Sequence, residues 1–126
     1  MVIIQLLFQQ SDNKLIPFIT AGYPEKNSTE KLVLAAVEAG ADMIEIGIPY
    51  SDPLADGPII QASSQKALNN GITLDIIFDQ VKSIRSKTDI PLVMMGCYNP
   101  ILKWGHKKFL KRCSNSGVDG LILPDL

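Results

Sequence analysis

The chain has 126 residues, of which 46% are hydrophobic and 20% charged, and its net charge is −1. This length fits one domain with one core over residues 1–126, and the balanced charge argues against nucleic acid or an anionic membrane as a partner. No window holds the ~20 apolar residues of a membrane span, and the apolar start lacks the basic region of a signal peptide. Cys97 and Cys113 form neither a CxxC nor a metal-binding pattern, so we expect a reducing compartment and no metal site.

The spacing of apolar residues and turn residues predicts alternating strands and helices along the chain. Asn27 with Glu30 is typical of a capping box, Thr73 of a helix start, and Gly117 of a helix end. The segment 96–100 is predicted as a loop. Helices are predicted over residues 2–10, 27–39, 59–68, 73–84 and 106–116, and strands over residues 15–21, 43–47, 92–95 and 120–123.

This alternation indicates an α/β fold with parallel strands joined by right-handed helical crossovers. Two architectures fit: half of a (β/α)8 barrel, or a small open doubly wound sheet. The last predicted strand is apolar and has no helix after it to cover it, which favours the barrel. Because a whole barrel needs ~250 residues, the chain is predicted to form only the N-terminal half of a TIM barrel, with strands one to four.

The stretch from Met43 to Pro58 is the strongest candidate for a functional site. Side chains alternate along a strand, so Met43, Glu45 and Gly47 share one face of the strand. Burial is expected to raise the pKa of Glu45 and suit it to proton transfer, although a structural acid paired with a base is the alternative. Asp56 follows in a loop at the carboxyl end of the strand, where an acid/base pair in separate environments is plausible. Asp52 is assigned to turn chemistry.

Several blocks of sequence closely resemble the tryptophan synthase alpha chain. The resemblance covers nearly all of this chain, but only about the first half of the family's barrel. The block with Glu45 and Asp56 is the most specific. The matching segments are Ile16–Pro24, Ile44–Gln61, Tyr98–Pro100 and Gly117–Leu126.

The resemblance implies a lyase that cleaves indole-3-glycerol phosphate to indole and glyceraldehyde 3-phosphate in tryptophan biosynthesis. It implies no cofactor in this chain, and a pyridoxal-phosphate-dependent beta chain as partner in an alpha2beta2 tetramer. By the same resemblance, Glu45 is the catalytic acid/base and Asp56 the second catalytic carboxylate. Substrate contacts are implied for Phe18 and Ile60, and contacts with the beta chain for Pro53, Leu54 and Asn99.

Two features depart from that family. Cys97 stands where family members commonly carry an aromatic residue. The glycine-rich loops that hold the substrate phosphate follow later strands, which this sequence does not include. One alternative is therefore a truncated, inactive fragment that keeps only the surface that binds the beta chain, and another is a small doubly wound binding domain. Taken alone, the chain is expected to self-associate and to have little activity.

A cytoplasmic location is expected, or the plastid stroma if the gene is organelle-encoded. From the sequence alone, Phe18 fits a core position as well as a site. His106 is expected to be a solvated residue at a helix start, and Trp104 and Tyr98 are expected to pack against the core.

Overall fold

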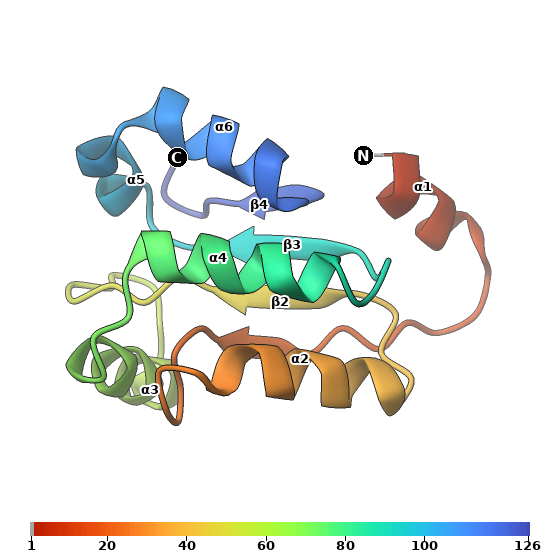
Figure 1. Cartoon of the computed structure of the whole chain (residues 1–126), viewed down its shortest axis with the longest axis horizontal. Helices are drawn as coiled ribbons and strands as arrows, with labels where there is room; N and C mark the ends of the chain where they lie inside the picture. The colour runs from red at the N-terminus through yellow and green to blue at the C-terminus, as the bar shows by residue number, and fades with distance from the viewer. Residues whose placement is uncertain (1) are drawn as a thin grey trace.

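The computed structural model describes residues 2–126, in which strands and helices alternate as the sequence predicts (Figure 1). The elements are α1 (Val2–Gln9), β1 (Phe18–Thr20), α2 (Ser28–Glu38), β2 (Ile44–Gly47), α3 (Pro58–Asn69), α4 (Leu74–Arg85), β3 (Leu92–Met95), α5 (Tyr98–Trp104), α6 (His106–Ser116) and β4 (Gly120–Ile122). None of the helices within residues 2–126 has both the length and the apolar character needed to cross a bilayer.

The strands form one parallel sheet in the order β1-β2-β3-β4. Each strand therefore pairs with its neighbour in the sequence, as in the wall of a (β/α)8 barrel, whereas the order reverses at a switch point in a doubly wound sheet. The register places Glu45 between Phe18 of β1 and Val93 of β3. All strands point toward the end of the molecule where α5 lies (Figure 1).

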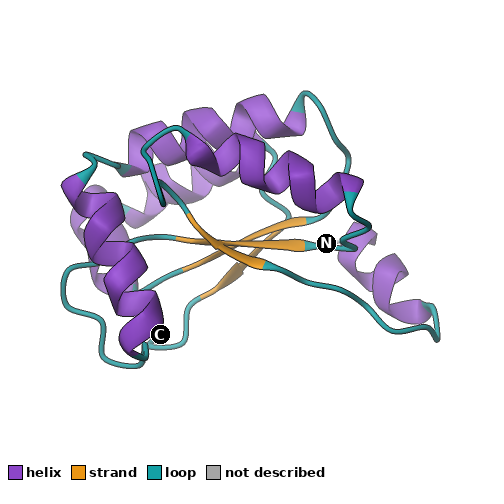
Figure 2. Cartoon of the chain, turned by 90° about the horizontal axis from the view of Figure 1, so that it is seen from below, coloured by secondary structure: helices purple, strands orange, loops and turns teal. Residues whose placement is uncertain are grey.

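The two faces of the sheet have different environments. One face carries Ile44, Ile46, Leu92 and Met94, which are fully buried in the main hydrophobic core with residues of the helices. Figure 2 shows the long helices gathered over this face, while the opposite face has no comparable helical layer among the described residues. That opposite face is the one that carries Glu45, and it corresponds to the interior of a barrel.

Helix α1 lies at the amino ends of the strands (Figure 1), and the predicted helix of residues 2–10 is thus confirmed. Its Ile4 side chain reaches the Glu45 face of the sheet, because a Cβ atom added to Gly120 would lie 3.3 Å from Ile4 Cδ1 and 3.4 Å from Val93 Cγ2. Helix α1 thus covers this face near the amino ends of the strands and helps to bury Val93, which is 4% exposed.

At the amino ends of the strands, one ion pair and its hydrogen bonds connect α4, β3 and β4. Arg85 Nη2, at the end of α4, contacts Asp119 Oδ2 at 2.6 Å, and the same carboxylate oxygen accepts a hydrogen bond from Leu92 N at 2.9 Å. The guanidinium also donates to the carbonyl oxygens of Gly117, Thr88 and Ile90. Since these partners precede β3 and β4, the contacts fix where both strands begin.

The structure confirms some local predictions. Thr73 caps α4 by accepting a hydrogen bond from Ile76 N, and Gly117 ends α6 with a left-handed φ of 90°. Trp104 packs against Phe78, with ring centroids 5.7 Å apart.

Other local predictions are wrong. The capping box does not form, because the Asn27 side chain makes no cap hydrogen bond and Glu30 pairs with Lys87 instead. The strand predicted over residues 15–21 is shorter, and the segment 96–100, predicted as a loop, enters helix α5 at Tyr98.

Candidate active site

A small pocket opens at the carboxyl ends of β1, β2 and β3. Three of the predicted site residues, Phe18, Asp56 and Ile60, line it together, although they come from a strand, a loop and a helix. The volume of the pocket is about 40 Å³, far below the roughly 300–1,000 Å³ of small-molecule sites. The complete lining is Phe18, Gly47, Ile48, Tyr50, Asp56, Ile60, Ser64, Met95, Gly96 and Cys97.

The floor of this pocket depends on a close approach between Phe18 and Gly47. A Cβ atom added to Gly47 would lie 2.4 Å from Phe18 Cζ, so only glycine leaves room for the ring. Thr20, the last residue of β1, shares a 2.8 Å hydroxyl contact with Ser63 of α3. That contact holds α3, and with it Ile60, beside the end of β1.

Glu45 lies on the same face of the sheet, one pleat below the pocket. It precedes Gly47 by two residues, a separation of roughly 6.6 Å along a strand. Its direct neighbours in the sheet are Phe18 and Val93. The residue is partly exposed, and the described residues give its carboxylate no hydrogen bond or ion pair. The expected full burial is thus not seen, because these residues build only one wall around it.

Asp56 lies in the loop of residues 50–57, between β2 and α3. Gln61 Nε2 donates a 2.7 Å hydrogen bond to the carbonyl oxygen of Asp56, which anchors the end of this loop to α3. The carboxylate acts on Cys97 across the pocket: burial raises the pKa of the Cys97 thiol, and the negative charges of Asp125 and Asp56 raise it further. Asp56 and Cys97 thus line one pocket, although they come from the loop after β2 and the segment after β3.

The three residues expected to contact the beta chain lie outside the pocket. Leu54 is 93% exposed at the tip of the loop, and Pro53 beside it is partly exposed. Asn99 is also exposed, near the start of α5, where its side chain donates to the hydroxyl of Tyr50. Asp52 accepts a 3.2 Å hydrogen bond from Ser51, as expected for a turn residue.

Sequence reasoning did not assign Tyr50, Ser64 and Met95 to the site, and treated Cys97 only as a departure from a family pattern. A signal for some of them was present, because the carboxyl ends of neighbouring parallel strands meet at one edge of a sheet. Residues directly after β2 and β3 therefore come together, which accounts for Tyr50 and Cys97. The contribution of Ser64 depends on how α3 packs, and the sequence pattern does not specify that packing.

A comparison with protein families matches residues 4–126 to the family model described as "Tryptophan synthase alpha chain". The chain is 58% identical over 120 residues to the tryptophan synthase alpha chain of Caldanaerobacter subterraneus, which covers 95% of this chain and 46% of that protein. It is 54% identical over 118 residues to that of Christiangramia forsetii, covering 93% of this chain and 46% of that protein. The chain thus spans about half the length of the curated relatives it matches.

Solved structures agree with the sequence comparisons. The alpha subunit of tryptophan synthase from Legionella pneumophila aligns with a TM-score of 0.93 and 37% identity, covering 99% of this chain and 48% of that one. A chain of the tryptophan synthase complex from Pyrococcus furiosus aligns with a TM-score of 0.85 and 48% identity, covering 91% of this chain and 48% of that one. The parallel strands are therefore the N-terminal half of a (β/α)8 barrel, and the chain belongs to the tryptophan synthase alpha chain family.

Proposed function

We propose that this chain supplies the acid/base half of an active site that cleaves indole-3-glycerol phosphate to indole and glyceraldehyde 3-phosphate. The observation that carries the proposal is the meeting of Phe18, Ile60 and Asp56 in one pocket, with Glu45 one pleat below on the same sheet face. Two apolar side chains suit an indole ring, and two carboxylates suit the proton transfers of a retro-aldol reaction.

In the proposed mechanism, Glu45 first delivers a proton to C3 of the indole ring. Positive charge then develops on the ring nitrogen, and the carboxylate of Asp56 accepts a hydrogen bond from that N–H and stabilises the charge. Glu45, now a carboxylate, removes the proton of the side-chain hydroxyl. The carbon–carbon bond breaks, its electrons return to the indole ring, and the hydroxyl carbon becomes the aldehyde of glyceraldehyde 3-phosphate. One glutamate thus donates a proton and then accepts one.

The substrate needs more space than the pocket provides. A volume of about 40 Å³ holds little more than one or two waters, so the loop of residues 50–57 must move outward when the indole ring enters. Binding of the phosphate is assigned to the other half of the barrel. Correct placement of the substrate by both halves supplies much of the rate, so the two halves must act together.

A pyridoxal-phosphate-dependent beta chain is the proposed partner, in an alpha2beta2 assembly, and no cofactor is proposed for this chain. The exposed side chains of Leu54 and Ile59, 93% and 82% accessible, offer an apolar contact surface beside the pocket mouth. A partner that covered this surface would also lie over the loop that carries Asp56, and indole would have a short path to it. One structural neighbour is described as an alpha2beta2 tryptophan synthase complex, from Pyrococcus furiosus.

Activity can be tested in a chimaera that joins residues 1–126 of this chain to the remaining half of the Caldanaerobacter relative. We expect the chimaera to release indole, and Glu45→Gln to abolish the release without changing the melting temperature. Asp56→Asn should lower kcat by about 100- to 1,000-fold, the range for loss of one charge-stabilising group. Asp52→Asn, a matched change in the same loop, should leave kcat unchanged. Substantial turnover by Glu45→Gln at any pH would remove Glu45 from the mechanism.

The half-length match to the relatives favours a second candidate function, that of a fragment that binds the beta chain without turnover. In that case the 126-residue chain would bind a purified beta chain, and Leu54→Asp would weaken the binding, while the bound chain would release no indole. Indole release by the 126-residue chain together with the beta chain, abolished by Glu45→Gln, would exclude this alternative.

A further inference from the structure

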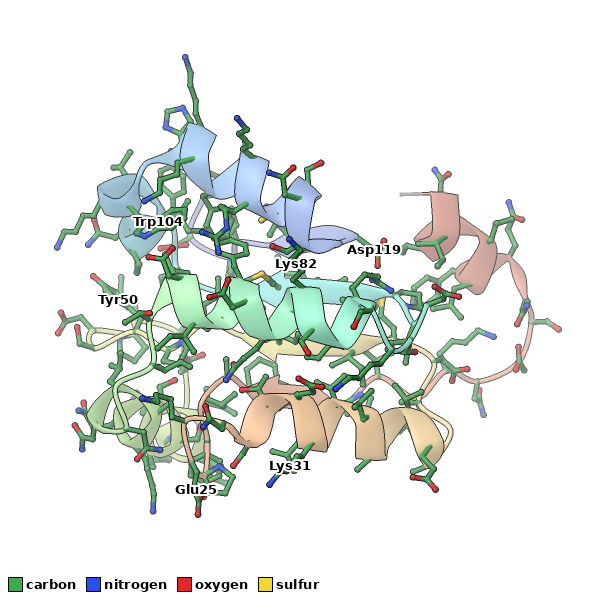
Figure 3. The ribbon with its side chains drawn as sticks, viewed as in Figure 1. Glu25, Lys31, Tyr50, Lys82, Trp104 and Asp119 are labelled. Carbon is green, nitrogen blue, oxygen red and sulfur yellow. The ribbon has the colours of Figure 1, made fainter. Side chains whose placement is uncertain are left out.

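One side-chain hydrogen bond joins the loop that follows β2 to helix α5, which follows β3. Asn99 Nδ2 donates to the hydroxyl of Tyr50 at 2.7 Å, although the two residues are 49 positions apart in the chain. Tyr50 is the first residue of the loop of residues 50–57 and also lines the pocket. Figure 3 shows Tyr50 at the carboxyl end of the sheet, opposite the end that carries Asp119. The loop after β2 is thus connected directly to α5.

The loop of residues 50–57 is held at both ends, by different elements. Its last residues are anchored to α3 through Gln61 and the carbonyl oxygen of Asp56. Its first residue is anchored to α5 through Asn99. Helix α5 is in turn held by Asp125, whose carboxylate accepts from Tyr98 N at 2.9 and 3.2 Å. The path of the loop therefore depends on the segments that follow β3 and β4.

Cys97 lines the same pocket as two residues of this loop, Tyr50 and Asp56. Burial raises the pKa of its thiol most, and the negative charges of Asp125 and Asp56 raise it further. Release of the loop would expose the sulfur atom and move the Asp56 carboxylate away from it. Both changes would favour the thiolate, which is the form that reacts with alkylating agents. The reactivity of Cys97 therefore reports whether the loop is closed.

We propose that Tyr50 and Asn99 form a latch that holds the loop of residues 50–57 over Cys97 and sets the position of the Asp56 carboxylate. Tyr50 and Asn99 are positioning residues, since they act through Asp56 and touch no reacting atom. A single hydrogen bond between neutral groups is weak enough to open when a substrate enters. The effect on catalysis rests on the proposed function, whereas the latch itself does not.

The test measures the alkylation rate of Cys97 by iodoacetamide in the chimaera, with each cysteine quantified by mass spectrometry. Tyr50→Phe and Asn99→Ala should each accelerate the alkylation of Cys97 about fivefold, the factor that corresponds to the net contribution of one neutral hydrogen bond. The double variant should react no faster than the faster single variant, because both substitutions break the same bond.

Two internal controls separate the latch from general loosening of the fold. Tyr98→Phe is the same substitution at a neighbouring tyrosine. The Tyr98 hydroxyl has no hydrogen-bond partner among the described residues, so this variant should leave the Cys97 alkylation rate unchanged. Cys113, which is 6% exposed and whose pKa is raised to about 11 by burial, should stay unreactive in every variant. An unchanged Cys97 rate in Tyr50→Phe, equal acceleration of Cys113, or rates that multiply in the double variant would each overturn the proposal.

The catalytic consequence has its own measurement. Tyr50→Phe should lower kcat/KM for indole-3-glycerol phosphate when Asp56 is present, and should have no further effect in the Asp56→Asn variant. If Cys97 reacts faster in Tyr50→Phe while substrate cleavage does not depend on Asp56, the latch is supported and the proposed function is refuted. A Cys97 rate that does not respond would refute the latch, whatever the lyase activity.

Discussion

The close contact between Gly47 and Phe18 predicts that Gly47→Ala damages both stability and the pocket. An added methyl carbon would lie 2.4 Å from Phe18 Cζ and 3.0 and 3.1 Å from the two Cε atoms. Contacts this short cannot persist, so the ring must leave its place on the pocket floor. Forcing an extra methyl group into a packed site costs about 1–3 kcal/mol. At about 2–4 °C per kcal/mol for a whole barrel, the melting temperature should fall by about 2–12 °C.

Phe18→Leu provides the matched control, because leucine lacks the three ring atoms that clash. The melting temperatures of the chimaera, the two single variants and the double variant form a double-mutant cycle. Gly47→Ala should cost at least about 1 kcal/mol less in the Phe18→Leu background than in the parent. An equal cost in both backgrounds would show that the ring does not lie against Gly47 and would refute the reasoning. On the proposed function, the KM of the chimaera for indole-3-glycerol phosphate should also rise in Gly47→Ala.

Three further predictions concern stability, with melting temperature as the measurement. Asp119→Ala should cost about 2–3 kcal/mol, because it leaves the partly buried Arg85 guanidinium with carbonyl partners only; a cost below about 0.5 kcal/mol would contradict this role. Thr73→Ala should cost about 1 kcal/mol, as expected for loss of a helix cap, and Thr73→Ser should restore most of it. Hydrogen bonds from Lys87 and Ser83 hold the pKa of Glu30 below its usual 4.5. The ionised Glu30 carboxylate therefore stabilises the folded state above about pH 4.5, and this contribution is lost as the pH falls through the lowered pKa. Glu30→Gln should therefore melt lower than the parent at neutral pH, with a difference that shrinks in acid.

Much of the fold follows from patterns that are local in the sequence. The apolar runs around Ile44 and Leu92 identify strands that are buried against helices, and the stripe of Ile77, Phe78 and Val81 identifies α4. Helix α5 was missed because Asn99-Pro100 resembles a turn, although proline is tolerated in the first turn of a helix. The capping box at Asn27 failed because Glu30 makes its contact with Lys87, a residue far along the chain.

The candidate site was predictable only in part. The residue types and spacing around Glu45 and Asp56 indicated one carboxylate within a strand and one in the loop that follows it, and the structure does place Asp56 in a pocket with Phe18 and Ile60. The contact of Asn99 with Tyr50 could not be foreseen, since it depends on how α5 is oriented after β3. The extent of Glu45 burial was overestimated because alternation within one strand does not reveal how much of the opposite wall is present.

The consecutive strand order also bears on how the sheet grows during synthesis. The paired positions Phe18 and Glu45, Glu45 and Val93, and Val93 and Gly120 are 27, 48 and 27 residues apart, so each strand meets a partner that has already emerged from the ribosome. At the ~5–20 residues per second of translation, each pairing can form within several seconds of the previous one. No strand after β1 has to wait for a later segment before it can pair, and the free edges at each stage are those of β1 and of the latest strand. The sheet can therefore be assembled one crossover at a time, in the direction in which the chain is made.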